Sequence, residues 1–252
     1  MLYRRVIPCL LLKNEALVKT IKFRKEKYIG DPINTVRIFN EKEVDELIFL
    51  DITATMNNKK PPFDIIHNIS KECFMPFSYG GGISSLDDVK KLFSLGVEKI
   101  AINSYFAKNH DFITKVSNIY GSQSVIVSID TKKDFFGRYK VFSRGGRKKI
   151  DYSPEQYAKI AEKCGAGEIL LTSINNDGVM NGYDIDLIKR VTDAVSVPVI
   201  ACGGAGCVND LGKAIKQGNA SAVAAGSMFV YQGKNRAVLI NFPNREKFNF
   251  LL

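Results

Sequence analysis

The residue of this chain best suited to acid–base chemistry is Asp130, which ends the apolar run "VIVSID". The segment "VIVSIDTK" (125–132) aligns without a gap with "VIPCLLLK" (6–13), and this alignment sets Leu11 opposite Asp130. A carboxylate can move a proton in a transition state, whereas leucine cannot. Asp130 is therefore either a proton-transfer residue without its counterpart or a cap of the loop that follows it.

Glycine groups recur at matching points of two halves of the chain. "PFSYGGG" (76–82) is followed about 20 residues later by Asn103-Ser104, and "PVIACGGAG" (198–206) by Gly226-Ser227. Loops of this kind expose backbone N–H groups that bind phosphate. The pair predicts two phosphate sites and a ligand with a phosphate at each end; the alternative is that these are ordinary turn glycines.

A second charged set lies at the opposite ends of the apolar segments. Four of these segments open with a charged residue, two cations and two anions: Arg5, Glu46, Lys99 and Glu168. One interpretation is a ring of salt bridges that closes one end of the fold. The other is a charged gate over an axial passage.

The elements that must position these residues are eight short apolar strands that alternate with helical patterns. The strands are predicted at residues 5–11, 46–52, 75–80, 98–103, 124–130, 168–173, 198–203 and 221–226. Each of the first seven is followed by a helix-like stretch, and "SSLDDVKKLFSLG" (84–96) is the clearest of these. Strands that are apolar on every residue are typical of a parallel sheet covered on both faces.

The internal repeat favours a closed barrel over an open doubly wound sheet. Residues 76–106 resemble residues 198–229, and the first strand resembles the fifth, so two halves of four units each complete a (β/α)8 TIM barrel. We expect one barrel domain over 1–252, with a hairpin insertion near 131–150. Active sites of such barrels form at the carboxyl ends of the strands, where Asp130 and the glycine loops lie.

Composition limits the function classes. The net charge of +10 favours an anionic ligand, but the basic residues are scattered, apart from "RGGRKK" (144–149), and nucleic-acid binding is not favoured. The two histidines and the five cysteines without a CxxC pair favour neither a metal site nor a disulfide framework, and they indicate a reducing cytoplasm. No apolar run reaches the roughly 18 residues that cross a membrane. We expect no cofactor.

The chain resembles the cyclase subunit of imidazole glycerol phosphate synthase over nearly its whole length. The resemblance is carried by "RVIPCL", "DELIFLDITAT", "GGGI", "INS", "YGSQSVIVSID", "GGRK", "GAGEILLTSINNDGVMNGYD" and "VPVIACGGAG". It implies a glutaminase partner docked on the barrel floor, with Glu98 at the contact, and ammonia that passes a gate and crosses the barrel. By position, the gate is Arg5, Glu46, Lys99 and Glu168, and Asp130 is one of two catalytic aspartates. The phosphate and substrate positions are Lys19, Gly82, Asn103, Ser104, Asp177, Gly178, Gly204, Gly226 and Ser227.

The sequence departs from this family at three places. Leu11 stands where the second catalytic aspartate belongs, and Thr20 replaces a glycine in the first loop. The segment 230–252, which includes "VYQGKNRAVLINFP", replaces an ordinary eighth helix. The last of these departures resembles a branch of the family associated with acetamidino modification of surface-polysaccharide sugars, which implies a separate ATP-using amidotransferase as a further partner.

Three functions follow as hypotheses. The first is an ammonia-conducting barrel subunit of a glutamine amidotransferase complex, with weak or lost cyclase activity. The second is an authentic cyclase of histidine biosynthesis with a different base in place of the missing aspartate. The third is a non-catalytic scaffold for a phosphorylated ligand.

Overall fold

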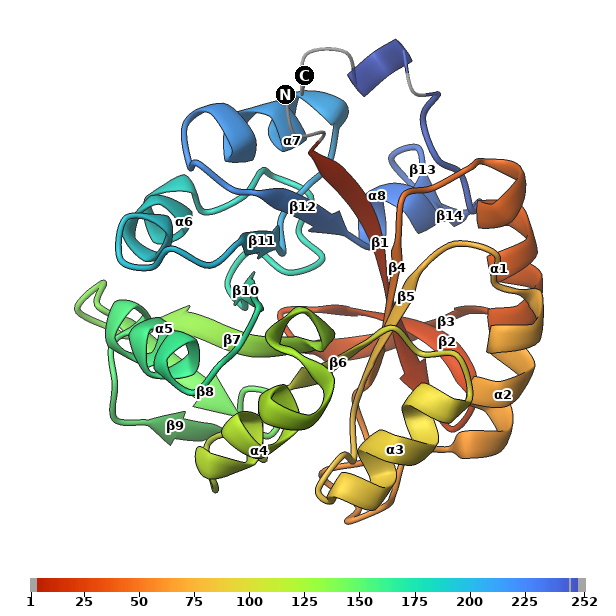
Figure 1. Ribbon diagram of the computed structural model, residues 1–252. Coiled ribbons are helices and arrows are strands. Elements are labelled where there is room, and N and C mark those ends of the chain that lie inside the picture. Colours follow the sequence, from red (N-terminus) through yellow and green to blue (C-terminus); the bar gives the residue numbers. More distant parts are fainter. Residues whose placement is uncertain (1–3, 245, 249–252) are drawn as a thin grey trace.

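Eight parallel strands close into a barrel in a computed structural model that describes residues 4–244 and 246–248 (Figure 1). In barrel order the strands are β1 (Arg5–Lys13), β4 (Leu47–Asp51), β5 (Phe77–Gly80), β6 (Lys99–Ile102), β7 (Val125–Lys133), β10 (Glu168–Ser173), β11 (Val199–Cys202) and β12 (Ala222–Ala225). The pairing of β10 with both β7 and β11, and of β1 with both β12 and β4, completes the ring. The predicted TIM barrel is confirmed, and an open sheet is excluded.

Helices cover the outside of the barrel. They are α1 (Pro32–Glu41), α2 (Phe63–Glu72), α3 (Leu86–Ser94), α4 (Asp111–Tyr120), α5 (Pro154–Lys163), α6 (Ile185–Thr192), α7 (Val208–Lys216) and the short α8 (Ser227–Val230). The predicted helix near 84–96 is confirmed as α3, because Ser85 and Asp88 form a capping box at its start and Gly96 follows its C-cap with φ +94°. Among the described residues no helix has the length and apolarity that a membrane crossing requires.

Alternation along the strands divides each one into an inward and an outward face. One buried cluster lies between the strands and the helices and includes Phe49 and Tyr79. A second, smaller cluster fills the barrel interior: Ile7, Cys9, Ile48, Ala101, Ile126, Leu170, Ile200, Ala222 and Ala224. Residues two apart share a face, so Arg5 and Leu11 of β1 point to the same interior as Ile7 and Cys9.

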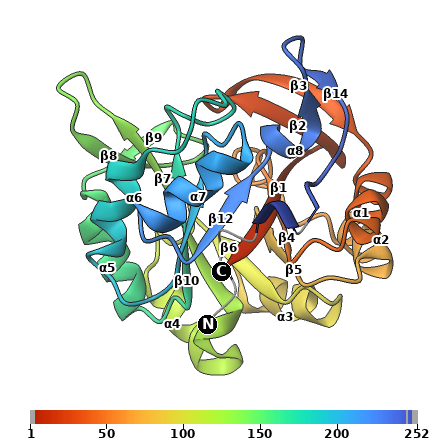
Figure 2. The same cartoon turned by 90° about the horizontal axis from the view of Figure 1, so that it is seen from above.

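Two antiparallel extensions rise from the carboxyl ends of opposite barrel strands. The hairpin of β2 (Ala16–Ile21) and β3 (Arg24–Gly30) continues β1, and β8 (Tyr139–Ser143) with β9 (Lys148–Ile150) continues β7. Both lie on the same side of the barrel (Figure 2). The expectation of a helical stretch directly after the first strand is wrong for 16–30, because a hairpin precedes α1 there.

The chain leaves the barrel through a short last helix. After the four residues of α8 come β13 (Tyr231–Gln232) and β14 (Ala237–Val238), which pair with each other. Phe242 then packs against Phe229 of α8 and against Phe248, with ring centroids 4.9 and 5.4 Å apart, so aromatic side chains cover surface that a longer helix would otherwise bury. Residues 245 and 249–252 of the atypical segment 230–252 lie outside the described part of the chain.

Candidate functional site

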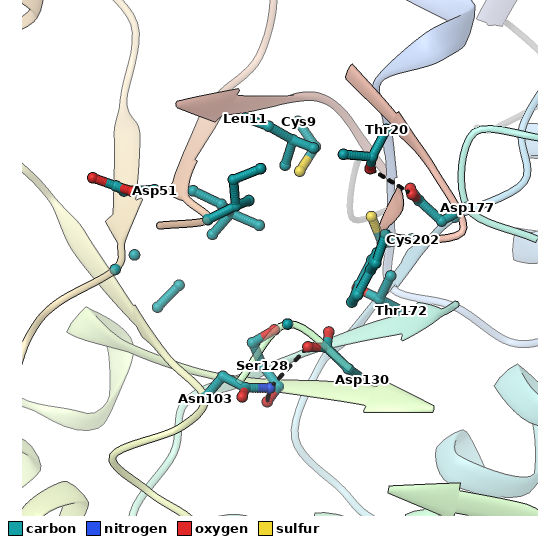
Figure 3. Close-up of a pocket in the computed structure, with 18 of the residues that line it drawn as sticks. Cys9, Leu11, Thr20, Asp51, Asn103, Ser128, Asp130, Thr172, Asp177 and Cys202 are labelled. Carbon is teal, nitrogen blue, oxygen red and sulfur yellow. Dashed lines mark hydrogen bonds between the residues drawn. The ribbon is translucent and has the colours of Figure 1, made fainter. Parts of the chain in front are cut away.

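A cavity of about 190 Å³ opens at the carboxyl ends of the barrel strands (Figure 3). It is lined by every residue predicted for substrate binding or catalysis: Lys19, Gly82, Asn103, Ser104, Asp130, Asp177, Gly178, Gly204, Gly226 and Ser227. Leu11 lies in the same wall. The structure therefore brings the predicted set together at one place, which we call the mouth.

Asp130 is buried in the wall of the mouth and is held by a neighbouring amide. Asn103 Nδ2 donates to Asp130 Oδ2 at 3.2 Å and to the Ser128 carbonyl at 3.0 Å. Burial raises the pKa of the Asp130 carboxyl to about 7, and the negative charge of Asp177 adds to this effect. A carboxyl with a pKa near neutrality exchanges protons readily in both directions, as a general acid or base must.

Leu11 faces Asp130 from the opposite wall of the mouth. β1 and β7 stand four strands apart in the barrel order, and the Leu11 side chain is 8% exposed. The nearby Asp51 does not replace the missing carboxylate, because its Oδ1 already accepts hydrogen bonds from Thr53 N, Thr53 Oγ1 and Ala54 N at 2.8–2.9 Å. Asp51 also follows Leu50 and so belongs to the outward register of β4, and Figure 3 shows its side chain turned away from Asp130.

Lys19 is a buried cation that has no carboxylate partner within the described part of the chain. Its side chain reaches from β2 to Gly226, where a Cβ would lie only 2.0 Å from Lys19 Nζ. Lys19 is 4% exposed, and no described carboxylate forms an ion pair with it. The adjacent Ser227 hydroxyl is buried and has no hydrogen-bond partner among the described residues. A buried charge and a buried unpaired hydroxyl are both costly, and a bound anion such as phosphate would satisfy both.

The matching position in the other half of the barrel is already occupied by protein contacts. Ser104 Oγ donates to Asn103 Oδ1 at 3.3 Å and accepts from Arg144 N at 3.0 Å. The two predicted phosphate loops therefore differ, and only the loop at Ser227 presents a free hydroxyl within the described structure.

The glycines of both loops are required by the backbone itself. Gly82 has φ +72° and Gly204 has φ +123°, which are conformations that side chains rarely adopt. A Cβ at Gly204 would lie 2.1 Å from the Gly182 carbonyl oxygen, and one at Gly82 would lie 2.6 Å from the Lys59 carbonyl oxygen. The turn interpretation thus holds for these glycines with or without a ligand.

The β2–β3 hairpin is fastened over one side of the mouth. Thr20 Oγ1 donates to Asp177 Oδ2 at 3.0 Å, and Lys22 N donates to the Asp177 carbonyl at 2.9 Å. A Cβ at Gly178 would lie 2.1 Å from the Thr20 carbonyl oxygen, so glycine permits this close approach. Thr20, which differs from the family at this position, thereby joins the hairpin to the loop after β10.

The sequence did not single out several side chains that line the mouth, and four of them are large. Arg144 and Arg147 of the turn between β8 and β9, Phe23 of the β2–β3 turn and Met56 of the loop after β4 all line the cavity. The dense cluster "RGGRKK" was a usable signal, because it follows the strand that ends in Asp130. Nothing in the sequence around Phe23 or Met56 indicated a site.

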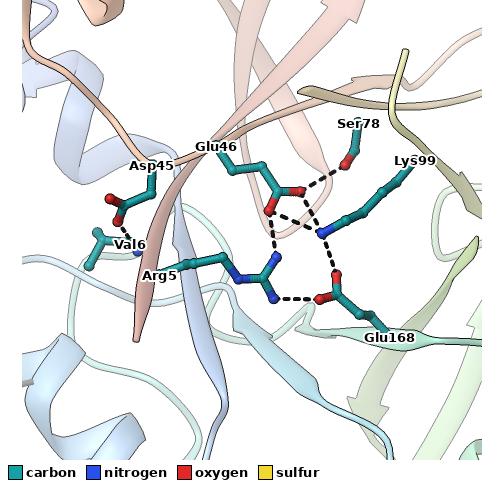
Figure 4. A network of polar contacts seen from close by, with 7 residues as sticks. All are labelled: Arg5, Val6, Asp45, Glu46, Ser78, Lys99 and Glu168. Carbon is teal, nitrogen blue, oxygen red and sulfur yellow. Dashed lines mark hydrogen bonds and ion pairs between the residues drawn. The ribbon is translucent and has the colours of Figure 1, made fainter. Parts of the chain in front are cut away.

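The four charges at the strand starts form one closed ring at the floor of the barrel (Figure 4). Arg5 contacts Glu46 and Glu168, each at 2.5 Å, and Lys99 contacts the same two carboxylates at 3.3 and 3.1 Å. Ser78 Oγ also donates to Glu46 Oε1 at 2.9 Å. Burial alone would lower the pKa of the Arg5 guanidinium, but the charges of Glu168 and Glu46 outweigh this and raise it.

The floor ring lies on the axis of the barrel, directly below the interior cluster. Arg5, Glu46, Lys99 and Glu168 share the inward register of their strands with Ile7, Ile48, Ala101 and Leu170. Both interpretations of the sequence, a salt-bridged floor and a gate, predict that these residues lie together, and their role in ammonia passage stays a prediction. The charges alternate around the ring, so the ring carries no net charge.

The predicted partner contact lies beside the ring. Glu98 directly precedes β6 and is exposed, and Phe74 in the neighbouring loop is 85% exposed. The role of Glu98 as a glutaminase contact stays a prediction. Within the described residues no group of three His, Cys, Asp or Glu side chains is placed to hold a metal ion.

The chain has close relatives over its whole length. Residues 5–236 match the family described as "Histidine biosynthesis protein". A protein of Pseudomonas aeruginosa that is named provisionally as imidazole glycerol phosphate synthase subunit hisF2 is 52% identical over 247 residues, 98% of each chain. A Leptospira interrogans protein, named provisionally as subunit HisF, is 49% identical over 98% of this chain and 97% of its own. The imidazole glycerol phosphate synthase subunit HisF of Alkaliphilus metalliredigens is 41% identical over 92% of each chain.

Proposed function

This chain belongs to the family of imidazole glycerol phosphate synthase cyclase subunits, and from that membership we propose that it is the ammonia-conducting barrel of a glutamine-dependent amidotransferase complex. A glutaminase docks on the floor around Glu98, and the ammonia that it releases enters through the floor ring. The barrel passes ammonia to the mouth and has weak or no cyclase activity of its own.

One observation carries this proposal: the floor ring is complete while the mouth has only one of two opposed proton-transfer groups. Arg5, Glu46, Lys99 and Glu168 are all engaged in the ring. At the other end of the axis Leu11 faces Asp130. Removing one general acid or base lowers a rate by about 10²–10⁴-fold, so this combination supports conduction over ring closure.

The barrel interior favours the passage of ammonia in its neutral form, NH3. Next to the floor ring the inward residues are aliphatic or small, including Ala101, Ala222 and Ala224, and the hydroxyl groups of Ser128 and Thr172 join them towards the mouth. An apolar passage of this kind opposes entry of the ammonium ion, whose desolvation is costly, far more than it opposes NH3. Ammonia therefore crosses as NH3 and the floor ring keeps bulk water and cations out.

At the mouth, a phosphorylated ligand binds where the protein leaves a cation and a hydroxyl unsatisfied. Lys19 and Ser227 hold its phosphate, and Arg144 and Arg147 supply further positive charge at the rim of the cavity. Asp130 moves protons to or from the arriving ammonia, because its pKa lies near neutrality. This assignment agrees with the net charge of +10.

The final acceptor in this proposal is an acetamido sugar of a surface polysaccharide, whose ATP-activated amide oxygen leaves and is replaced by the nitrogen of ammonia to give an acetamidino group. A separate ATP-using amidotransferase activates the sugar and uses the ammonia. The segment 230–243, by which the chain resembles that branch, supports this acceptor.

Purified barrel and the glutaminase of the same organism test the proposal directly. Adding the barrel should raise the rate of glutamine hydrolysis, measured as glutamate release, while the barrel alone with ammonium salt and the ribulosyl substrate should close little or no imidazole ring. The substitution Leu11→Asp restores the missing carboxylate and serves as the matched comparison, and it should raise ring closure by about tenfold or more. A barrel that neither binds nor stimulates the glutaminase contradicts the proposal.

A cyclase of histidine biosynthesis remains the second candidate function. The raised pKa of Asp130 and the retained Lys19 favour it, as do relatives named as HisF subunits at 41% identity. Ring closure by the unmodified chain at a rate that Leu11→Asp does not improve would establish this candidate and reject loss of cyclase activity.

A further inference from the structure

Two hairpins project beyond the barrel on opposite sides of the mouth (Figure 2). One is the tip between β7 and β8, residues 132–140, and the other is the turn between β13 and β14, residues 231–239. Figure 1 shows the same opposition from a second direction. We call these two tips the prongs.

The first prong presents an aromatic pair to solvent. Phe135 is 98% exposed and Phe136 is 76% exposed, and their rings touch edge to face with centroids 5.7 Å apart. Arg138 lies over the Phe136 ring at 5.1 Å. Exposed aromatic rings beside an arginine contribute nothing to the core of this barrel, and they are the side chains that most often anchor protein–protein contacts.

The first prong is held in a defined shape. Asp134 Oδ1 accepts from the backbone N–H groups of Phe136 and Arg138, both at 2.9 Å, and so fixes the turn. At its base Tyr139 donates to Asp184 and Asp186 at 2.7 and 3.1 Å. A rigid tip loses little conformational entropy on binding, which favours a recognition role.

The second prong repeats the combination of apolar and basic side chains. Val238 is 42% exposed and Leu239 is 50% exposed, and the turn carries Lys234 and Arg236. Arg236 donates to the Val179 carbonyl at 3.2 Å, and Lys27 of β3 donates to the Arg236 carbonyl at 3.2 Å, so this prong is fastened to the rim of the mouth.

Charge indicates the chemistry of the occupant. Residues 132–140 contain four cations and one acid; Arg138 pairs with Asp134 and Lys133 with Asp184, so Lys132 and Lys140 keep their charges without an ion pair among the described residues. The turn of the second prong adds Lys234 and Arg236 without an acid. A surface of this kind attracts a partner with acidic residues around apolar depressions.

We propose that the two prongs are the docking surface for the acidic face of the enzyme that consumes the ammonia, and that this enzyme closes the mouth when it docks. The inference rests on the proposed function, because only a conducting barrel needs a consumer over its outlet. A partner that inserts between the prongs would keep NH3 from reaching solvent. A flat lipid surface would touch the tips alone and leave the mouth open, which disfavours a membrane as the occupant.

The test uses the complete complex of barrel, glutaminase and the ATP-using amidotransferase of the same organism. Product formation is measured once with glutamine and once with ammonium chloride as the nitrogen source. The double variant Phe135→Ser/Phe136→Ser should lower the glutamine-dependent rate by about tenfold or more and leave the ammonium-dependent rate and glutamine hydrolysis unchanged.

Affinity of the amidotransferase for the unmodified barrel should fall as the salt concentration rises. Val238→Ser/Leu239→Ser should act in the same direction.

The control is Ile119→Ser, which changes an exposed apolar side chain on α4, away from the prongs. It should leave both rates unchanged. If the unmodified complex transfers glutamine nitrogen and the double variant transfers it equally well, the docking surface is wrong and the proposed function stands. If the unmodified barrel supports no glutamine-dependent transfer, the proposed function fails and this inference with it. The double variant could also keep full transfer but lose binding to vesicles of phosphatidylcholine and phosphatidylglycerol, which would assign the prongs to a membrane. If it keeps full transfer but loses self-association, the prongs bind a second copy of the chain. Either result would overturn the inference.

Discussion

Asp130 is a carboxylate whose surroundings favour its protonated form. Its pKa is raised from 3.8 to about 7, first by burial and then by the charge of Asp177. Because the folded pKa lies above the unfolded one, folding binds a proton between about pH 4 and pH 7. The protein therefore loses stability as the pH rises through this window, and the loss is complete above pH 7.

The substitution Asp130→Asn should remove the loss of stability that accompanies rising pH. The amide keeps an oxygen that can accept from Asn103 but carries no charge, so the variant should be more stable than the unmodified protein at pH 8 by up to about 4 kcal/mol. The two proteins should converge near pH 4, where both carry a neutral side chain. Urea unfolding at pH 4, 6 and 8 measures the difference.

Asp134→Asn is the matched control at the surface. Hydrogen bonds from the Arg138 backbone and side chain lower the pKa of Asp134, so its charged form is favoured in the folded state. The control variant should gain no stability at pH 8. Equal behaviour of the two variants across pH would show that burial does not govern Asp130.

At the scale of residues, the sequence predicts which side chains lie together at the mouth but not how their pKa values and hydrogen-bond partners differ. The rule that sites lie at the carboxyl ends of barrel strands was enough to place Asp130 and Leu11 at one mouth, whereas Lys19 was placed there only by the family resemblance. The pKa of Asp130 and the unequal surroundings of Ser104 and Ser227 depend on neighbours from distant strands, and no local pattern contains that information.

At the scale of elements, the β2–β3 hairpin combines strain with anchoring. Its two-residue turn, Lys22 and Phe23, has φ +54° and +60°, values that glycine and asparagine adopt more readily. The strain is offset by contacts to the loop after β10, where Asp177 accepts from Thr20 and from the Lys22 backbone. The turn end of the hairpin is thus held by one acidic residue, in addition to the pairing of β2 with β1 at its base.

Thr20→Val should loosen this hairpin. Valine has nearly the shape of threonine but no hydroxyl, so one buried oxygen of Asp177 loses its donor. We expect amide hydrogen exchange within 16–30 to accelerate by about tenfold, while the barrel strands exchange as before. Thr20→Ser keeps the donor and should exchange like the unmodified protein. Unchanged exchange in Thr20→Val would mean that the Thr20–Asp177 contact does not hold the hairpin.

The barrel strands were predicted within three residues at each end, but this hairpin was not. Apolar runs bounded by glycine and polar loops mark buried parallel strands clearly. The segment 16–30 lacks those marks, because β3 is largely exposed and basic and the turn contains no glycine. Its strand form depends on pairing with the extended end of β1, which is a tertiary contact.

At the scale of the whole molecule, one register joins the floor to the mouth. Because inward residues recur every second position, β1 presents Arg5 to the floor, Ile7 and Cys9 to the interior and Leu11 to the mouth. A substitution in the middle of this axis should therefore affect the passage of ammonia from the floor to the mouth without changing the polar groups at either end.

Ala224→Leu tests that expectation. Ala224 is fully buried in the interior cluster, and three added carbon atoms would fill space near the axis at a cost of about 1–3 kcal/mol from overpacking. In the proposed complex, glutamine-dependent transfer should fall by about tenfold or more, while stimulation of the glutaminase at the floor and use of added ammonium at the mouth should persist. Ala224→Ser, which adds one small atom, should transfer normally, and a thermal melt confirms that each variant is folded. If Ala224→Leu folds and still transfers glutamine nitrogen at the full rate, ammonia does not travel along the barrel axis, and the floor ring is a structural closure.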